Sequence, residues 1–158
     1  MLYFAYGSNL NHEQMLSRCP GYRAVGLAEL RDHRLVFPLH SHTWEGGVAS
    51  VQPAHGESVW GMVFELTDTD LEALDRYEGY RGPDNQHNVY DRNSTYVELT
   101  RPDDGSFPRR LRVNCYFARP SNPGPPSRRY LDAIVAGARH HRLPADYIAA
   151  LAKSAVRD

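Results

Sequence analysis

The sequence predicts an α+β fold built on a mostly antiparallel, partly closed sheet with flanking helices. Two observations predict this class. Segments typical of strands follow one another along most of the chain. Segments typical of helices occur only after the first strand, between Thr67 and Gly79, and near the C-terminal end. Regular alternation of strand and helix, which favours a parallel sheet, is not seen. We expect a single domain over residues 1–158, because this length can bury one hydrophobic core.

The first element is an apolar, aromatic-rich run, Tyr3–Tyr6, which is typical of a strand entering a core. The turn-forming residues Gly7, Ser8 and Asn9 end it. A capping pattern at Asn11 predicts a helix that runs to about residue 19. This polar loop between a strand and a helix offers free backbone N–H groups and the positive end of a helix dipole. Both suit a carboxylate or a developing oxyanion.

Short strands are expected next, and their predicted ranges are Ala24–Leu30, Leu35–Leu39, Val48–Val51 and Val59–Leu66. Pro53 is expected to stop the third of them. The fourth alternates most clearly between two faces, and Gly61 within it indicates a close backbone approach or a bulge.

The second half of the chain supplies further helices and strands. A helix begins after Thr67 and ends at Gly79, and a polar loop follows to Asn88. Strands are expected over 90–100 and 111–118, joined by a turn at Pro102–Gly105. Ser127 caps the next helix, and Leu143-Pro144 opens the last one.

Composition narrows the classes of partner. The net charge of −1 gives no reason to expect nucleic acid, and we interpret Arg109-Arg110 and Arg128-Arg129 as solvated loop or helix-end residues. No apolar run is long enough to cross a bilayer, and no secretory signal is apparent. The two cysteines, Cys19 and Cys115, lie far apart and fit reduced thiols. We therefore expect a cytoplasmic protein that binds neither nucleic acid nor membrane.

One acidic residue stands where an apolar one is expected. The helix after Thr67 has an apolar stripe formed by Leu71, Leu74 and Tyr77, and Glu78 falls on the same stripe. A buried carboxylate raises its pKa unless it is paired, and the last turn of a helix disfavours a negative charge. Glu78 is therefore a candidate general base shielded from water.

A structural explanation of Glu78 stays open beside this one. The side chain could turn to solvent at a frayed helix end, or it could pair with an arginine such as Arg81. The other acids of this helix are expected to project from its remaining faces, and they are Asp70, Glu72 and Asp75.

The sequence resembles the γ-glutamylcyclotransferase family over nearly its whole length. The matching segments are Tyr6–Leu10, Thr43–Ala49, Ser58–Val63, Leu74–Gly79 and, near the C-terminal end, 126–127, 130, 137–138 and 143–147. The resemblance implies a small mixed, mostly antiparallel β-barrel with flanking helices. It also implies release of 5-oxoproline and a free amino acid from a γ-glutamyl amino acid.

The resemblance further assigns roles to residues. Glu78 corresponds to the family's catalytic glutamate, and Tyr90 and Tyr116 correspond to pocket residues. The substrate-binding loop corresponds to Tyr6, Gly7, Ser8, Asn9 and Leu10. The expected partner is a small γ-glutamyl substrate, with no cofactor and no metal. The oligomeric state is left open between monomer and homodimer.

Two other chemistries can be considered for this sequence, nucleophilic catalysis and metal binding. Ser8 or Cys115 could act as a nucleophile, but Ser8 has no histidine in an obvious motif relation and Cys115 lies on the apolar face of a strand. Metal binding could involve either of two histidine pairs, His40 with His42 or His140 with His141. Neither pair has a carboxylate at ligand spacing, so surface or structural histidines are favoured.

The substrate itself is left open by the sequence. The segment Thr43–Ala49 is most similar to enzymes that act on γ-glutamyl amino acids. Related families act on glutathione, γ-glutamylamines or an antibiotic intermediate. A non-catalytic γ-glutamyl-binding module is a further alternative, although an acid on an apolar stripe has no use there.

Overall fold

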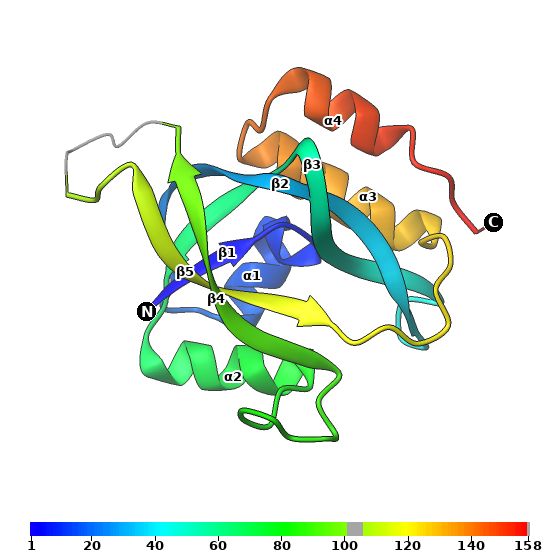
Figure 1. Cartoon of the computed structure of the whole chain (residues 1–158), viewed down its shortest axis with the longest axis horizontal. Helices are drawn as coiled ribbons and strands as arrows, with labels where there is room; N and C mark the ends of the chain where they lie inside the picture. The colour runs from blue at the N-terminus through cyan, green and yellow to red at the C-terminus, as the bar shows by residue number, and fades with distance from the viewer. Residues whose placement is uncertain (101–105, 158) are drawn as a thin grey trace.

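The computed structural model describes residues 1–100 and 106–157, and its strands form a closed barrel (Figure 1). The strands are β1 (Leu2–Ala5), β2 (Arg23–Ser41), β3 (Gly46–Glu65), β4 (Tyr90–Leu99) and β5 (Arg110–Ala118). They are ordered β1-β3-β2-β4-β5 around the barrel. All the neighbouring pairs are antiparallel except β1 with β5, which is parallel. This mixed, mostly antiparallel barrel confirms the predicted α+β class.

Helices pack around the barrel (Figure 1). They are the 3-10 helix η1 (Ser8–Leu10) and the α-helices α1 (His12–Arg18), α2 (Asp68–Glu78), α3 (Arg128–His140) and α4 (Ala145–Ala152). Figure 1 shows α2 on one side of the barrel, and α3 with α4 on the opposite side. None of the helices in residues 1–100 and 106–157 is long and apolar enough to span a membrane.

Strands β2 and β3 are long and bent, which corrects the prediction of shorter strands in this part of the chain. The predicted pairs of strands on either side of residue 32 and of Pro53 are each continuous. Asp32 adopts a φ of 57°, and the pairing shifts register between Arg31 and His33. Pro53 pairs with His33 directly beside this shift. The irregularity lets both strands bend without ending, so a proline is tolerated where a stop was predicted.

The helix boundaries follow the predicted caps. The Asn11 side chain accepts a hydrogen bond from Gln14 N at 3.1 Å at the start of α1. Thr67 caps α2 in the same way, and Gly79 ends that helix with a φ of 68°. Ser127 caps α3 through a bond from Tyr130 N at 3.3 Å. The predicted turn at Pro102–Gly105 lies outside the described residues.

Two glycines allow close approaches that place the 7–10 loop. A Cβ at Gly61 would collide with the carbonyl oxygen of Ala5, so β3 passes close to β1 as the sequence predicted. A Cβ at Gly137 would collide with the backbone of Leu10, so α3 packs directly on η1. Leu10 is itself fully buried in the core. The loop between β1 and α1 is therefore held between the barrel and α3.

Candidate active site

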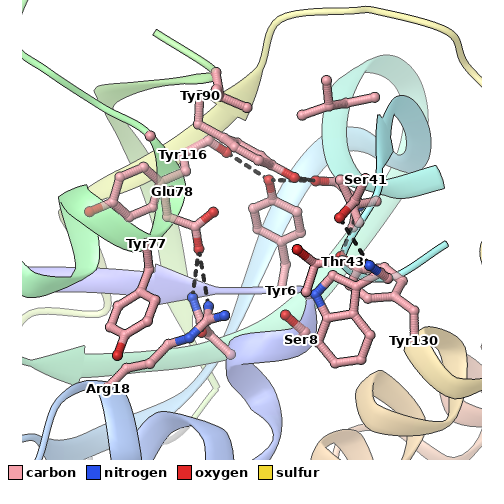
Figure 2. A pocket seen from close by; sticks show the side chains of 18 of the residues that line it. Tyr6, Ser8, Arg18, Ser41, Thr43, Tyr77, Glu78, Tyr90, Tyr116 and Tyr130 are labelled. Atoms are coloured by element: carbon pink, nitrogen blue, oxygen red, sulfur yellow. Dashed lines mark hydrogen bonds and ion pairs between the residues drawn. The ribbon is translucent and has the colours of Figure 1, made fainter. Parts of the chain in front are cut away.

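A cavity of about 450 Å³ is lined by residues from the β1–α1 loop, from the β2–β3 hairpin and from α2. The predicted site residues that line it are Tyr6, Gly7, Ser8, Asn9, Glu78, Tyr90 and Tyr116. Figure 2 shows Glu78, Arg18 and Tyr77 on one side of the cavity, and Ser41, Thr43 and Tyr130 on the other. Leu10, which the resemblance placed in the substrate-binding loop, packs in the core and does not line the cavity.

Glu78 occupies the last turn of α2 with its side chain 16% exposed. Its Oε1 atom accepts a hydrogen bond from Asn9 Nδ2 at 3.0 Å and lies 3.8 Å from Arg18 Nη1. Its Oε2 atom has no hydrogen-bond partner in the part of the chain that the structure describes, and the carboxylate points toward the cavity in Figure 2. Burial raises the pKa of Glu78, against the opposing effects of Arg18 and Asn9.

Asn9 connects the loop to this carboxylate. Besides its bond to Glu78, its Nδ2 donates to the Tyr3 hydroxyl at 2.9 Å. Its Oδ1 accepts from Gln14 Nε2 and from Arg18 Nη1, both at 3.0 Å. The side chain is buried and uses both of its donors and both of its lone-pair sites within the protein. Asn9 therefore orients Glu78 rather than offering its side chain to a ligand.

Arg18 is a site residue that the sequence analysis missed. It ends α1, lies 3.8 Å from Glu78, and places its Cζ atom 4.6 Å from the centre of the Tyr77 ring. The arginine considered from the sequence, Arg81, follows α2 in the chain and is not the partner of Glu78 among the described residues. The sequence signal for Arg18 was its position as a cation at the end of the helix that follows the loop. Basic residues at helix ends are too common for this position to indicate a site.

The face of α2 that packs against the rest of the protein is not the face predicted from the sequence. Tyr77 is 58% exposed, whereas Asp70 is buried and the Asp75 side chain is only 17% exposed. The prediction that both acids project to other faces is wrong. Helical spacing explains the error, because Asp75 lies four residues after Leu71, about 40° away around the helix. Tyr77 lies six residues after Leu71, about 120° away around the helix.

Asp75 has two close partners beside the cavity, both on its Oδ1 atom. The Tyr116 hydroxyl donates to its Oδ1 at 2.6 Å, and Arg92 Nε lies 3.0 Å from the same atom. Burial raises the pKa of Asp75, while Tyr116 and Arg92 both act to lower it. Tyr116 therefore faces the cavity with its ring, and its hydroxyl is directed to Asp75.

Tyrosines form much of the remaining wall, and their hydroxyls are also engaged. Tyr90 donates to the Ala49 carbonyl at 2.7 Å, and Tyr6 donates to the Tyr116 carbonyl at 2.6 Å. The Tyr130 hydroxyl accepts from Ala49 N at 2.9 Å. Burial raises the pKa of Tyr6, Tyr90 and Tyr130 alike, so all are neutral near pH 7. From the sequence, Tyr130 was placed among the positions that resemble the family and was given no role in the site.

The start of η1 presents polar groups to the cavity. The N–H groups of Ser8 and Asn9 open this short helix and so have no acceptor within it. Ser8 Oγ accepts from Gln14 Nε2 at 2.8 Å. A Cβ at Gly7 would lie 3.4 Å from Ala49 Cβ and 3.5 Å from the Tyr130 hydroxyl, so a larger side chain there would extend toward the cavity wall.

The structure gives no support to the alternative nucleophiles or to a metal centre. Ser8 Oγ is bonded to Gln14 rather than to a histidine. Cys115 is fully buried, and burial raises its pKa; burial also raises the pKa of Cys19 to about 12. Within residues 1–100 and 106–157, no group of three or more His, Cys, Asp or Glu residues is placed to hold a metal ion.

Comparisons with known proteins agree with this geometry. A family model described as "Gamma-glutamyl cyclotransferase, AIG2-like" matches residues 3–147. Gamma-glutamylcyclotransferases of Bos taurus and Homo sapiens are each 31% identical over 150 residues, covering 92% of this chain and 74% of the relative. A solved gamma-glutamyl cyclotransferase superposes with a TM-score of 0.87 at 29% identity, covering 100% of this chain and 89% of the other. The chain is therefore an enzyme of the gamma-glutamyl cyclotransferase, AIG2-like family.

Proposed function

We propose that the protein releases 5-oxoproline and a free amino acid from γ-glutamyl amino acids, with Glu78 as general acid and base. One observation carries this proposal. Glu78 is a mostly buried acid whose Oε1 atom is held by Asn9 and Arg18, while its other oxygen is left for a ligand in the cavity. A base that must take and return a single proton requires this combination of a fixed orientation and an accessible oxygen.

The reaction needs no nucleophile from the protein. The α-amine nitrogen of the substrate attacks its own γ-carbonyl carbon, and a five-membered ring closes as the new C–N bond forms. The bond between the γ-carbon and the nitrogen of the acceptor amino acid then breaks. One proton leaves the attacking amine, and one proton is delivered to the departing amine. Holding the amine close to the carbonyl supplies much of the acceleration, because an intramolecular attack needs only the correct conformation.

Glu78 moves that proton in this scheme. Its free Oε2 accepts the proton from the substrate amine and returns it to the leaving nitrogen. Because burial raises the pKa of Glu78, it is a stronger base than an exposed glutamate. Asn9 and Arg18 hold the carboxylate through its other oxygen, so the reacting oxygen keeps its direction during both transfers.

The loop and the tyrosines provide binding in different ways. The N–H groups of Ser8 and Asn9 can donate hydrogen bonds to the substrate α-carboxylate or to the oxyanion of the tetrahedral intermediate. The hydroxyls of Tyr6, Tyr90 and Tyr116 are bonded to the protein, so these residues contribute their aromatic faces. We therefore assign them to shaping the cavity rather than to donating hydrogen bonds to the substrate.

The proposal is tested by assaying purified protein against γ-glutamyl amino acids, glutathione and γ-glutamylamines, with 5-oxoproline as the readout. We expect γ-glutamyl amino acids to give the highest kcat/KM. A higher kcat/KM for glutathione or a γ-glutamylamine would support the proposed reaction but show that the preferred substrate is a different one. Binding without 5-oxoproline from any compound would contradict the proposal and favour a γ-glutamyl-binding module. We place the activity in the cytoplasm, where the buried free thiols of Cys19 and Cys115 remain reduced.

A further inference from the structure

A second cavity, of about 490 Å³, adjoins the first. The side chains of His40 and Trp44, on the β2–β3 hairpin, line both cavities. The second cavity is otherwise lined by His42, Glu45, Ser127, Arg129 and Arg157. It therefore lies where the hairpin tip meets the start of α3, beside the end of the first cavity that is opposite Glu78 in Figure 2.

Two arginines from different parts of the chain are fixed at this second cavity. Arg129 Nη2 donates to the Thr43 carbonyl at 2.6 Å, and Arg157 Nη1 donates to the Glu45 carbonyl at 3.1 Å. The backbone of Arg157 is also anchored, because its N–H bonds to the Pro126 carbonyl at 2.9 Å. The Arg129 guanidinium lies over the Trp44 ring, with its Cζ atom 4.6 Å from the ring centre. Both cations are thus held against the turn of the hairpin.

These arginines retain donors for a ligand. A guanidinium has five N–H groups, and each of the bonds above uses one of them. Glu45 Oε1 lies 4.0 Å from Arg129 Nη2, which is longer than a hydrogen bond, and the Glu45 side chain is 80% exposed. With two guanidinium groups and one carboxylate among the described residues that line it, the second cavity has an excess of positive charge. The Arg128-Arg129 pair, interpreted from the sequence as solvated residues, thus contributes one member to a cavity.

We propose that the second cavity is a subsite for the carboxylate of the acceptor amino acid, with Arg129 and Arg157 as its ligands. This inference rests on the proposed function. The acceptor is the part of the substrate that extends away from the reacting carbon, and in a γ-glutamyl amino acid it ends in a carboxylate. Arginine is well suited to bind a carboxylate because of its paired, charge-assisted donors. A γ-glutamylamine has no such group, so the subsite selects γ-glutamyl amino acids over γ-glutamylamines.

The experiment compares γ-glutamyl-alanine with γ-glutamyl-alaninamide, which differ only in that carboxylate. We expect wild type to prefer the acid in kcat/KM by about tenfold, the scale of charge-assisted contacts at a half-exposed site. The Arg129→Gln/Arg157→Gln double variant should bring the ratio to within about twofold of one. Arg128→Gln is the matched control, since it removes the same charge from the same helix and Arg128 lines neither cavity.

The outcomes separate this inference from the proposed function. A preference that survives in the folded double variant, or that disappears instead in Arg76→Gln at the first cavity, would overturn the subsite. Calorimetric titration of both compounds into Glu78→Gln protein measures the preference without turnover. If wild type makes no 5-oxoproline, the proposed function fails, and acid-selective binding that depends on Arg129 and Arg157 still supports the subsite. Equal affinity for acid and amide would overturn the subsite whatever the turnover.

Discussion

Helix α2 carries two acids in its second half, Asp75 and Glu78, and the protein surrounds them differently. Their side chains are almost equally exposed, 17% and 16%, and burial is the largest cause of a raised pKa for both. Asp75 accepts a tyrosine hydroxyl at 2.6 Å and has a guanidinium at 3.0 Å. Glu78 has an amide at 3.0 Å and its cation at 3.8 Å.

The difference shows that burial alone does not identify a base. Asp75 is held at close range by Tyr116 and Arg92 and does not line the cavity, so it links α2 to the barrel. Each acid is held through one oxygen, but Glu78 lies farther from its cation, at 3.8 Å, and it lines the cavity. We therefore expect changes at Glu78 to affect turnover, and changes at Asp75 to affect stability.

The largest expected effect is at Glu78. Glu78→Gln keeps the Oε1 acceptor for Asn9 and removes the base, so turnover should fall by roughly 10²-fold or more. The variant removes a mostly buried charge whose net environment disfavours ionisation, and Arg18 keeps its hydrogen bond to Asn9 and its contact with the Tyr77 ring. The melting temperature should therefore be unchanged or higher. Circular dichroism establishes the fold, and the release of 5-oxoproline measures the rate. Near-normal turnover by folded Glu78→Gln protein would remove Glu78 from the mechanism.

The loop provides the next test. Gly7 has a φ of −111°, outside the left-handed region that favours glycine, so the expected effect of a side chain there comes from the space it fills. A valine there would extend its methyl groups toward Ala49 and Tyr130, where the substrate is expected to lie. Gly7→Val should therefore lose substrate binding in isothermal titration while remaining folded. Wild-type affinity would make the loop a connection without a binding role.

Asp75→Asn should show the opposite behaviour from Glu78→Gln. It leaves Arg92 without its carboxylate partner in a mostly buried position, which costs about 1–3 kcal/mol of unfolding free energy. Chemical denaturation measures the loss, and turnover in the folded fraction should stay within about threefold of wild type, because Asp75 does not line the cavity. A large loss of turnover without a loss of stability would reverse the roles of the two acids.

The fold class and the helix caps could be predicted from sequence because they depend on local patterns. Thr67, Ser127 and Asn11 cap the helices as expected. The continuity of β2 and β3 could not be predicted, because local turn signals at Pro53 were outweighed by pairing between long strands. Such pairing depends on the partner strand, so it cannot be deduced from the residues of either segment alone.

The same distinction between local patterns and long-range contacts explains why only part of the site was predicted. Glu78 could be found because a charge on an apolar stripe is a local anomaly. Arg18 and Arg92 could not be found, since their partners lie 60 and 17 residues away in the chain. The role of Asn9 as a connector also depends on the contact between the loop and α2, which only the tertiary structure establishes.

The smallest expected effect comes from the cation beside Glu78. Arg18 lowers the pKa of Glu78, so Arg18→Gln should raise it further, and the loss of rate at acidic pH should begin at a higher pH than in wild type. Arg18→Lys keeps the charge and serves as the control, with a profile closer to wild type. If the decrease of rate at acidic pH occurs at the same pH in Arg18→Gln as in wild type, Arg18 only packs against Tyr77.

The central claim is that Glu78 acts as a base with a raised pKa, and the pH dependence of kcat/KM tests it most directly. Only deprotonated Glu78 can accept the proton from the substrate amine, so kcat/KM should fall as pH drops through a pKa above the ~4.3 of a free glutamate. Asp75→Asn should keep the same fall of kcat/KM at acidic pH. That result would assign the fall to Glu78 rather than to Asp75, whose pKa is also raised. The unfolding free energy of wild type should also decline relative to Glu78→Gln as pH rises through the same window, because the folded state binds the proton more tightly. A rate that stays constant down to about pH 4.3, or a fall at acidic pH that disappears in Asp75→Asn, would contradict the account.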